Sequence, residues 1–317
     1  MKKYVIYCFL MLSIFSCFRK KTPSLNISSW LETYFPNQFD VLDSNVRMLD
    51  VLAQLKGEKQ ALVSEKQDPE LQFYLDWQKN SSSLGIDSST VISAYERAKK
   101  DIANGRYLFK LLKEKGLNGF SVGVIDHAAY ILVFLEPIPK AREQLLTTIK
   151  MTLGAGVEPA QTSIFIEIME PDSLHAEFKD IIPYGHWITG RAWQEAHKIM
   201  SLDFEWINDL DWSALNQKWE LNSMSKRSSQ YREFARQKAT DWAQKNLPKP
   251  FFMPSNRPFS CETVVQNGPA IRYGFPYYDQ NIPEEASAYD PEPKGYVAGT
   301  YSFDQKTFTL LKNEQAH

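Results

Sequence analysis

Cysteine is scarce in this sequence. The chain of 317 residues contains three, Cys8, Cys17 and Cys261. This count excludes a metal site built on pairs of cysteines.

The sequence also lacks an excess of charge of one sign. It contains 36 basic and 38 acidic side chains, which give a formal net charge of −2. Proteins that bind nucleic acids usually carry a basic field, so we predict no nucleic-acid partner.

Long hydrophobic runs and repeats are also missing. The N-terminal apolar run, Tyr4–Phe15, spans twelve residues, whereas a helix that crosses a bilayer needs about 20. Neither an internal repeat nor a sustained heptad is present. Hydrophobic residues make up 43% of the chain and charged residues 23%, as in ordinary globular proteins. We therefore expect one large domain or two smaller ones, with no cofactor.

The N-terminus carries the most informative pattern in the chain. Lys2 and Lys3 precede the apolar run, and Ser16-Cys17 follows it. A basic start, a short apolar run and a small residue before the cut are typical of a secretory signal peptide.

The same segment resembles a bacterial lipoprotein signal. Ile14 and Ser16 fit the aliphatic and small positions before the cysteine, while Phe15 departs from the small residue that is usual there. The resemblance implies that Cys17 is lipidated, with palmitate or a similar acyl chain, and becomes the first residue of the mature protein. Cys8 would leave with the signal peptide, so Cys261 would be the one cysteine left without lipid. No disulfide could then form within the mature chain, and the fold must depend on its hydrophobic core.

Two other interpretations of this segment stay open. Arg19, Lys20 and Lys21 follow the apolar run, and basic residues there oppose export. An uncleaved membrane anchor or plain secretion would also fit. The preferred localisation is the bacterial cell envelope, at the outer membrane, with the basic residues resting on anionic headgroups.

The sequence divides into four parts. Residues 1–16 form the signal peptide, and residues 17–27 carry the lipidated cysteine and a tether. An α+β domain is predicted over 28–200. Residues 201–317 form a helical segment followed by β-hairpins, either as a separate domain or as part of the preceding one.

The first third of the mature chain is predicted to be mainly helical. Helices are expected at Ser28–Tyr34, with Ser28 or Ser29 as the N-cap, and at Pro69–Gln78. A longer helix starts at Ser88, is interrupted at Gly105 and ends at Gly116, where glycine suits a C-terminal cap. Short strands are expected at 38–42 and 61–65.

The middle of the chain has the strongest β patterns. Phe120–Ile125 and Ala128–Glu136 are apolar runs separated by Asp126-His127, which suggests a hairpin. Leucines and isoleucines at positions 145, 146, 149 and 153 mark an amphipathic helix, and Thr162–Met169 is a third strand. This order predicts an α+β fold with a mixed or antiparallel sheet.

The last third combines helices with hairpins. One helical face is predicted from Trp212 to Trp219 and another from Tyr231 to Trp242. Strands at 262–266 and 270–275 flank Asn267-Gly268, a favourable hairpin turn. A final hairpin is expected from 296–303 and 307–311, after an irregular segment at 276–293.

Gly119-Phe120-Ser121-Val122-Gly123 matches the G-x-S-x-G pattern of a nucleophile elbow. That chemistry needs the serine at a sharp turn from a strand to a helix. Here a helix precedes the motif and a strand follows it, so we favour a glycine-flanked strand over a nucleophile at Ser121. Asp126-His127 could be an acid/base pair, but adjacent residues of a strand point to opposite faces.

Glu167 lies on the strand face opposite Ile164, Ile166 and Ile168, where burial would raise its pKa. Glu170 and His175 follow, and a metal or acid/base site could use the three. No recognised ligand spacing is present, so we favour a strand whose second face meets solvent.

The segment 184–193 gathers aromatic and polar side chains. Aromatic rings stack on sugars or peptides while Arg and His donate hydrogen bonds. Tyr184, His186, Trp187, Arg191 and Trp193 are therefore the candidate ligand-binding residues. The alternative is a loop that anchors its aromatic rings in the core.

Two hypotheses follow. The first is a lipid-anchored envelope protein that binds a protein or glycan partner without catalysis, attached to the membrane through Cys17. The alternative is an envelope hydrolase that uses Ser121. The lack of a catalytic motif in its proper context favours the first.

Overall fold

A computed structural model gives the structure of most of the chain. It describes residues 26–46, 58–78, 85–125, 128–156, 163–173, 180–183, 191–207, 209–255, 259–265, 268–282 and 291–311. The described residues form two compact units. Those up to Ile102, with Pro183, make unit 1, and the others make unit 2.

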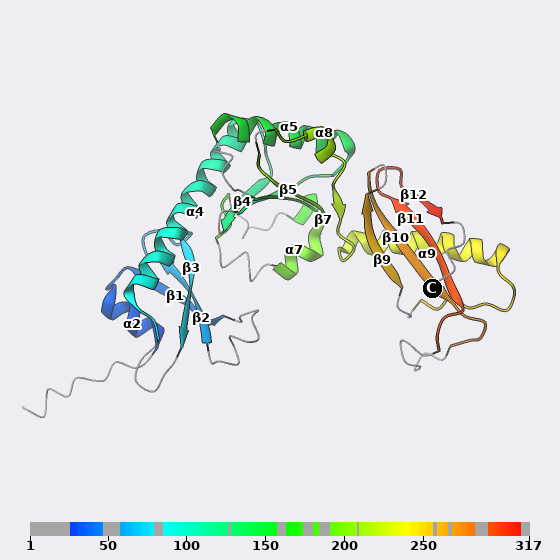
Figure 1. The fold of residues 1–317 in the computed structure, drawn as a ribbon, viewed down its shortest axis with the longest axis horizontal. Coiled ribbons are helices and arrows are strands. Elements are labelled where there is room, and N and C mark those ends of the chain that lie inside the picture. The colour runs from blue at the N-terminus through cyan, green and yellow to red at the C-terminus, as the bar shows by residue number, and fades with distance from the viewer. Residues whose placement is uncertain are drawn as a thin grey trace, which may run out of the picture. The chain divides into compact units, whose positions relative to one another are not determined.

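The described part of the chain contains both helices and strands along its length (Figure 1). The helices are α2 (Ile27–Tyr34), α4 (Ser88–Glu114), α5 (Pro139–Gly156), α7 (Arg191–His197), α8 (Trp212–Leu215) and α9 (Lys226–Asn246), with a short 3-10 turn η1 (Pro171–Ser173). The strands are β1 (Phe39–Val46), β2 (Glu58–Glu65), β3 (Gln72–Gln78), β4 (Phe120–Ile125), β5 (Ala128–Phe134), β6 (Ser163–Met169), β7 (Lys198–Glu205), β8 (Glu220–Leu221), β9 (Ser260–Val265), β10 (Pro269–Tyr277), β11 (Gly295–Ser302) and β12 (Thr307–Leu310). They form three sheets that are mostly antiparallel, which confirms the predicted α+β fold.

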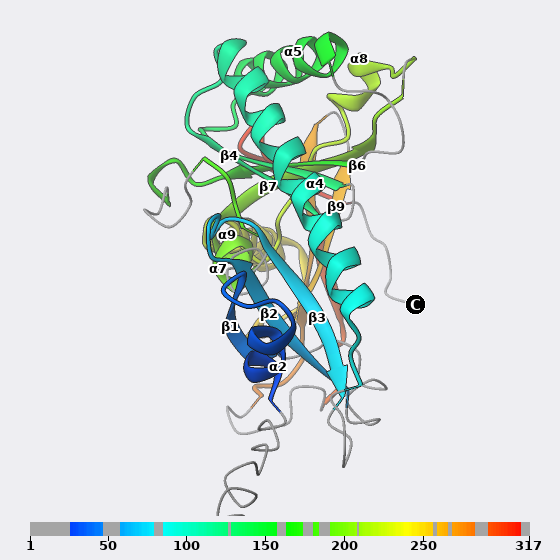
Figure 2. The same ribbon diagram turned by 90° about the vertical axis from the view of Figure 1, so that its left-hand side faces the viewer.

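Unit 1 is a three-stranded antiparallel sheet, β1-β2-β3, whose apolar face packs against α2 and the first half of α4 (Figure 2). Helix α2 begins one residue earlier than predicted, because its N-cap is Asn26. The Asn26 Oδ1 accepts a hydrogen bond of 2.8 Å from the backbone N–H of Ser29. The prediction of Ser28 or Ser29 as the cap was therefore wrong.

The predicted helix at Pro69–Gln78 is also wrong, because this segment contains strand β3. Phe73, Leu75 and Trp77 are buried and alternate with more exposed residues. This period of two matches a strand with one covered face. Pairing along the whole length of β2 outweighs the local helical pattern.

Helix α4 runs without a break through Gly105, where the sequence predicted an interruption. Gly105 packs close to Val124, since a Cβ at this glycine would lie 3.5 Å from the Val124 side chain. The close approach explains why a glycine is tolerated inside the helix. The predicted stop is confirmed, because Gly116 follows the helix with a φ of 88°.

Unit 2 contains a five-stranded sheet in the order β4-β5-β6-β7-β8. The predicted hairpin is confirmed: β4 and β5 pair antiparallel, with Ser121 opposite Leu132. Helix α5 connects β5 to β6, which pair in parallel. Ile131, Ile164 and Ile166 are buried on the sheet face that α5 covers.

The four-stranded sheet of unit 2 is antiparallel and joins β9, β10, β11 and β12 in sequence order. Both predicted C-terminal hairpins are confirmed by its pairing. Helix α9 packs on one face of this sheet (Figure 1), where Ala235, Ala239 and Ala243 join the core. Gly268 adopts a φ of 118° in the first turn, as glycine permits.

One predicted helix in unit 2 ends earlier than expected. The helix predicted through Trp219 stops at Leu215, because Trp219 is fully buried beside strand β8. The domain boundary predicted at 200/201 lies inside strand β7, which pairs with β6 within unit 2.

Candidate functional site

Ser121 lies in the interior of a sheet and not at a turn. Its side chain is 0% exposed, and its Oγ has no hydrogen-bond partner within the described part of the chain. Residues 180–182 run beside β4 on its free edge, where the backbone of Val122 bonds to those of Asp180 and Ile182. The serine therefore sits within a hydrogen-bonded sheet, which is unlike the exposed elbow that a nucleophile requires.

The residues predicted to bind a ligand are only partly described. Tyr184, His186 and Trp187 lie outside the described residues, as does the side chain of Arg191, which begins α7. Trp193 is described, and it packs on the small core formed by Leu132, Met169 and Ile182. Asp126, His127 and His175 also lie outside the described residues.

The best-organised polar cluster lies where the two parallel strands end. Glu136 follows β5 by two residues, and Glu170 comes directly after β6. In open parallel α/β sheets, ligands bind outside the carboxyl ends of the strands, and β5 and β6 are the parallel pair in this otherwise antiparallel sheet. We call this cluster, with the residues that contact it from α7 and α9, the carboxyl-edge site.

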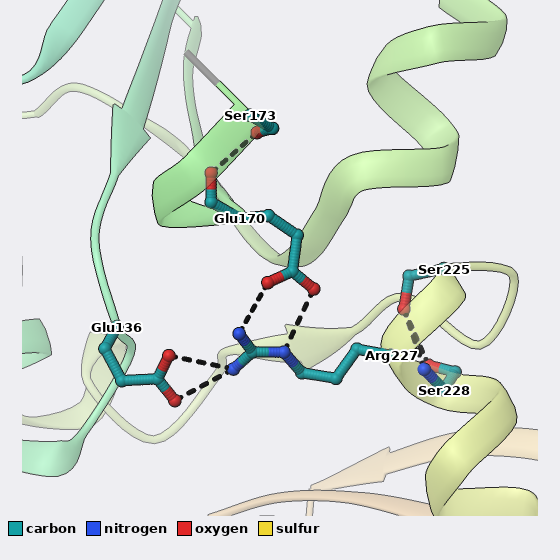
Figure 3. A network of polar contacts seen from close by, with 6 residues as sticks. All are labelled: Glu136, Glu170, Ser173, Ser225, Arg227 and Ser228. Carbon is teal, nitrogen blue, oxygen red and sulfur yellow. Dashed lines mark hydrogen bonds and ion pairs between the residues drawn. The ribbon is translucent and has the colours of Figure 1, made fainter.

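Arg227 of α9 joins both carboxylates (Figure 3). Its Nε and Nη2 donate to the two oxygens of Glu170 at 3.0 and 2.5 Å, and its Nη1 donates to both oxygens of Glu136 at 2.8 and 3.0 Å. Burial opposes the charge of Arg227, but these bonds outweigh it and raise the pKa of the guanidinium. Glu136 is the open side of the cluster, since its side chain is 54% exposed against 21% for Glu170.

The start of α9 is fixed by a second set of polar contacts. Ser225 is the N-cap, and its Oγ accepts a bond of 3.1 Å from the backbone N–H of Ser228. The Asn222 side chain donates to the carbonyl oxygens of Glu195 and Lys198 at 2.6 and 3.0 Å. These bonds attach the beginning of α9 to α7 and β7, and so they position Arg227 over the strand ends.

Helix α7 lies beside this cluster and carries a stacked pair of rings. The rings of Trp193 and His197 stack with centroids 4.5 Å apart. The His197 Nδ1 lies 2.8 Å from the Trp193 carbonyl oxygen, so in a neutral ring this nitrogen carries the hydrogen. Its Nε2 then faces the Nζ of Lys226 at 3.3 Å, and the His197 carbonyl accepts from the Glu170 backbone N–H.

Glu167 lies on the sheet face opposite the buried isoleucines, as predicted, and it pairs with a lysine. The Nζ of Lys198 is 3.4 Å from the Glu167 Oε1 and 2.9 Å from the Glu195 Oε1. Burial lowers the pKa of Lys198, but the charges of Glu167 and Glu195 and their hydrogen bonds together outweigh this effect and raise it. Among the described residues, no group of three or more His, Cys, Asp or Glu side chains is arranged to hold a metal.

The carboxyl-edge site combines charge, hydrogen-bonding groups and an aromatic ring, which are the elements of ligand recognition. Glu170 and Trp193 were candidate site residues from the sequence, whereas Glu136 and Arg227 were not. Their contact joins positions 91 residues apart, and no local pattern encodes such a pairing. The capping sequence Ser225–Ser228, which starts α9, was the one available indication.

Comparisons with known proteins identify no function. No family model matches the chain, and no curated protein matches it. A solved structure, described as a DUF5037 family protein from Ruminococcus gnavus ATCC 29149, is 11% identical in sequence and has a TM-score of 0.37. The match covers 61% of this chain and 98% of that one. A similarity at this level supports no argument about fold or function.

Proposed function

We propose that this chain is a bacterial lipoprotein that is anchored in the cell envelope through lipid on Cys17 and acts as a non-catalytic binding module. The observation that carries the anchor is the position of Ser16-Cys17 directly after a short apolar run. None of the described helices is both long and apolar enough to cross a bilayer.

The binding role is supported by the carboxyl-edge site. Arg227 is held by a half-buried carboxylate on one side and by an exposed one on the other. The ring of Trp193 ends the aromatic segment predicted to contact a ligand, and it lies in the helix that touches this cluster. The partner class is a glycan or a protein of the envelope.

The hydrolase alternative has less support. A nucleophilic serine needs a base within hydrogen-bond reach and an open approach for the substrate. Ser121 is fully buried, and no described residue accepts or donates a hydrogen bond to its Oγ. We therefore place the binding module ahead of the enzyme.

The anchor is tested by the intact mass of the protein from the membrane fraction. We expect a chain that starts at Cys17 and carries acyl mass, and we expect this mass to be lost in Cys17→Ala. Cys8→Ala is the matched control, since this cysteine lies within the predicted signal peptide and its loss should leave the mature mass unchanged. An uncut chain without lipid in the wild type would remove the proposal of an anchor.

The binding role is tested on a chain that starts at residue 17 and carries Cys17→Ser. This protein is screened against envelope glycan fragments and peptides immobilised on an array. We expect one class of probe to be retained, and Trp193→Ala or Arg227→Gln to weaken its binding at least tenfold. Arg236→Gln is the control, because Arg236 lies on the same helix and pairs there with Glu233. Turnover of a retained probe would contradict the non-catalytic role.

A further inference from the structure

The cysteine that the lipid anchor does not use lies in a distinct setting on the four-stranded sheet. Cys261 of β9 is exposed and stands directly opposite Tyr273 of β10 in the antiparallel register. Side chains of such a pair point to the same face and approach within about 5 Å at their Cβ atoms. This is the face on which α9 packs, because Tyr273 belongs to the core that contains the α9 alanines.

Tyr273 brings a hydroxyl group that has no partner. The residue is 2% exposed, and its Oη makes no hydrogen bond within the described part of the chain. Burial raises the pKa of this phenol, and the nearby Cys261 thiol acts in the same direction. The hydroxyl therefore stays protonated and able to donate. A buried polar group without a partner calls for an explanation, and a hydrogen bond to a group bound beside Cys261 would supply one.

Arg232 of α9 supplies an uncompensated charge at the same place. Its guanidinium carbon lies 5.0 Å from the ring centroid of Phe259, two residues before Cys261. The charge of Arg232 also acts on the Tyr273 phenol. Arg227 and Arg236 of the same helix both pair with glutamates, whereas Arg232 has no carboxylate partner among the described residues.

We propose that Cys261 is a thiol-modification site that takes small anionic disulfides. The Cys261 thiolate attacks one sulfur of the disulfide, a new sulfur–sulfur bond forms, and the other half of the reagent leaves as a thiolate that takes up the proton. The disulfide is itself the oxidant, so one thiol is consumed and one is released. Arg232 holds the carboxylate of the bound half, Tyr273 donates its hydroxyl hydrogen to it, and Phe259 packs against its carbon atoms.

Cysteine usage agrees with this role. An unpaired cysteine in an exported protein is typical of a reactive thiol or an intermolecular bond. The envelope is a compartment in which disulfides persist, so the biological setting rests on the proposed function. The chemistry of the site does not, and it can be measured in the purified protein whatever the state of Cys17.

The test uses a chain that starts at residue 17 with Cys17→Ser, in which Cys261 is the single thiol. Its rate of reaction is measured with 5,5′-dithiobis(2-nitrobenzoate), an aromatic disulfide with two carboxylates, and with neutral 2,2′-dithiodipyridine. We expect Arg232→Gln to slow the anionic reagent about fivefold at low salt, as one nearby unit charge implies, and to leave the neutral reagent unchanged. High salt should reduce the difference. Arg236→Gln should change neither rate.

Tyr273→Phe provides a second readout, because it keeps the ring and removes only the hydroxyl. We expect reduced glutathione to reverse the mixed disulfide about threefold faster in this variant, in line with the loss of one hydrogen bond. Equal slowing of both reagents by Arg232→Gln would assign Arg232 a purely structural role and overturn the proposal. The proposal also fails if wild-type Cys261 discriminates between the reagents no better than N-acetylcysteine does. Formation of a disulfide-linked dimer ahead of the mixed disulfide would overturn it as well.

Discussion

At the scale of single residues, the described part of the chain contains buried hydroxyl groups that make no hydrogen bond there, such as those of Ser121 and Tyr273. Ser121 is the clearest case, since it matches a catalytic pattern and yet is enclosed between neighbouring strands. The motif misleads because five residues specify the glycines but not the turn that makes a nucleophile. Because its Oγ is buried and makes no hydrogen bond, Ser121 lowers the stability of the fold.

Replacement of Ser121 by alanine should therefore stabilise the protein. Removing a buried hydroxyl that makes no hydrogen bond is expected to raise the free energy of unfolding by about 1 kcal/mol. Chemical denaturation measures this change, and p-nitrophenyl acetate hydrolysis checks for activity. Ser228→Ala is the control, since the Ser228 side chain is also buried but its hydroxyl donates a hydrogen bond to the Asn222 carbonyl oxygen. A destabilised Ser121→Ala variant, or one that loses esterase activity, would contradict this account.

At the scale of elements, the sequence predicted hairpins better than isolated strands. The pairs β4–β5, β9–β10 and β11–β12 were all predicted, because each has two apolar runs around a short polar break. Strand β3 was missed, since nothing local marks its pairing with β2. Trp219 was assigned to a helix because its spacing from Trp212 fits a helical face, but its burial beside β8 decides its conformation. Local patterns therefore predict an element where its own residues fix the conformation, and they fail where contacts with another element fix it.

Helix caps give a prediction with a defined pH dependence. Asp87 caps α4, and its Oδ1 accepts from the Ser89 hydroxyl at 2.7 Å and from the Thr90 N–H at 2.8 Å. These bonds, that of Ser89 first, hold the pKa of Asp87 below its ordinary value. A lowered pKa means that the stabilisation is complete above the unfolded-state pKa and disappears as the pH falls through the folded-state value.

We therefore expect Asp87→Ala to lower the melting temperature at neutral pH, and the difference from wild type to shrink below about pH 4, where an unperturbed aspartate protonates. Thermal unfolding from pH 2 to 7 measures it. Asn26→Ala is the control, because the Asn26 cap of α2 is an amide that does not titrate. A difference for Asp87→Ala that stays constant down to pH 2 would show that the carboxylate charge is not involved.

The carboxyl-edge site gives a prediction about the contact between α9 and the strand ends. Arg227→Ala would leave the half-buried Glu170 without its cation, which should cost about 2 kcal/mol of unfolding free energy. Glu136→Gln should cost less than about 1 kcal/mol, because that carboxylate is mostly exposed. Urea denaturation compares the two variants. If Glu136→Gln proves as costly as Arg227→Ala, the two carboxylates do not differ as their exposure indicates.

At the scale of the whole molecule, one ion pair joins helix α5 to the C-terminal hairpin of unit 2. Arg142 of α5 donates from both Nη atoms to Asp304, in the turn between β11 and β12, at 2.8 and 2.6 Å. The two side chains are 5% and 19% exposed, and Arg142 also donates to the Pro137 carbonyl oxygen. The pair spans 162 positions of sequence, so no sequence pattern could have predicted it.

Arg142→Ala should lower the free energy of unfolding by about 3 kcal/mol, because it strands a largely buried carboxylate. The double variant Arg142→Leu/Asp304→Leu should recover most of this loss, since neither charge then remains. Arg272→Ala is the exposed control, and its pairing with Glu262 should be worth less than about 1 kcal/mol. A double variant as unstable as Arg142→Ala would indicate that the pair is needed for more than charge balance.

The order of the strands has a consequence for how the molecule assembles. In all three sheets of the described structure, each strand bonds to the strand that precedes or follows it in sequence. Contacts between segments that are close along the chain form early and fast. A chain that emerges from a ribosome in the N-to-C direction can therefore complete the strand order of each sheet before the next sheet appears. The bond between Arg142 and Asp304 can form only after the final turn has been synthesised.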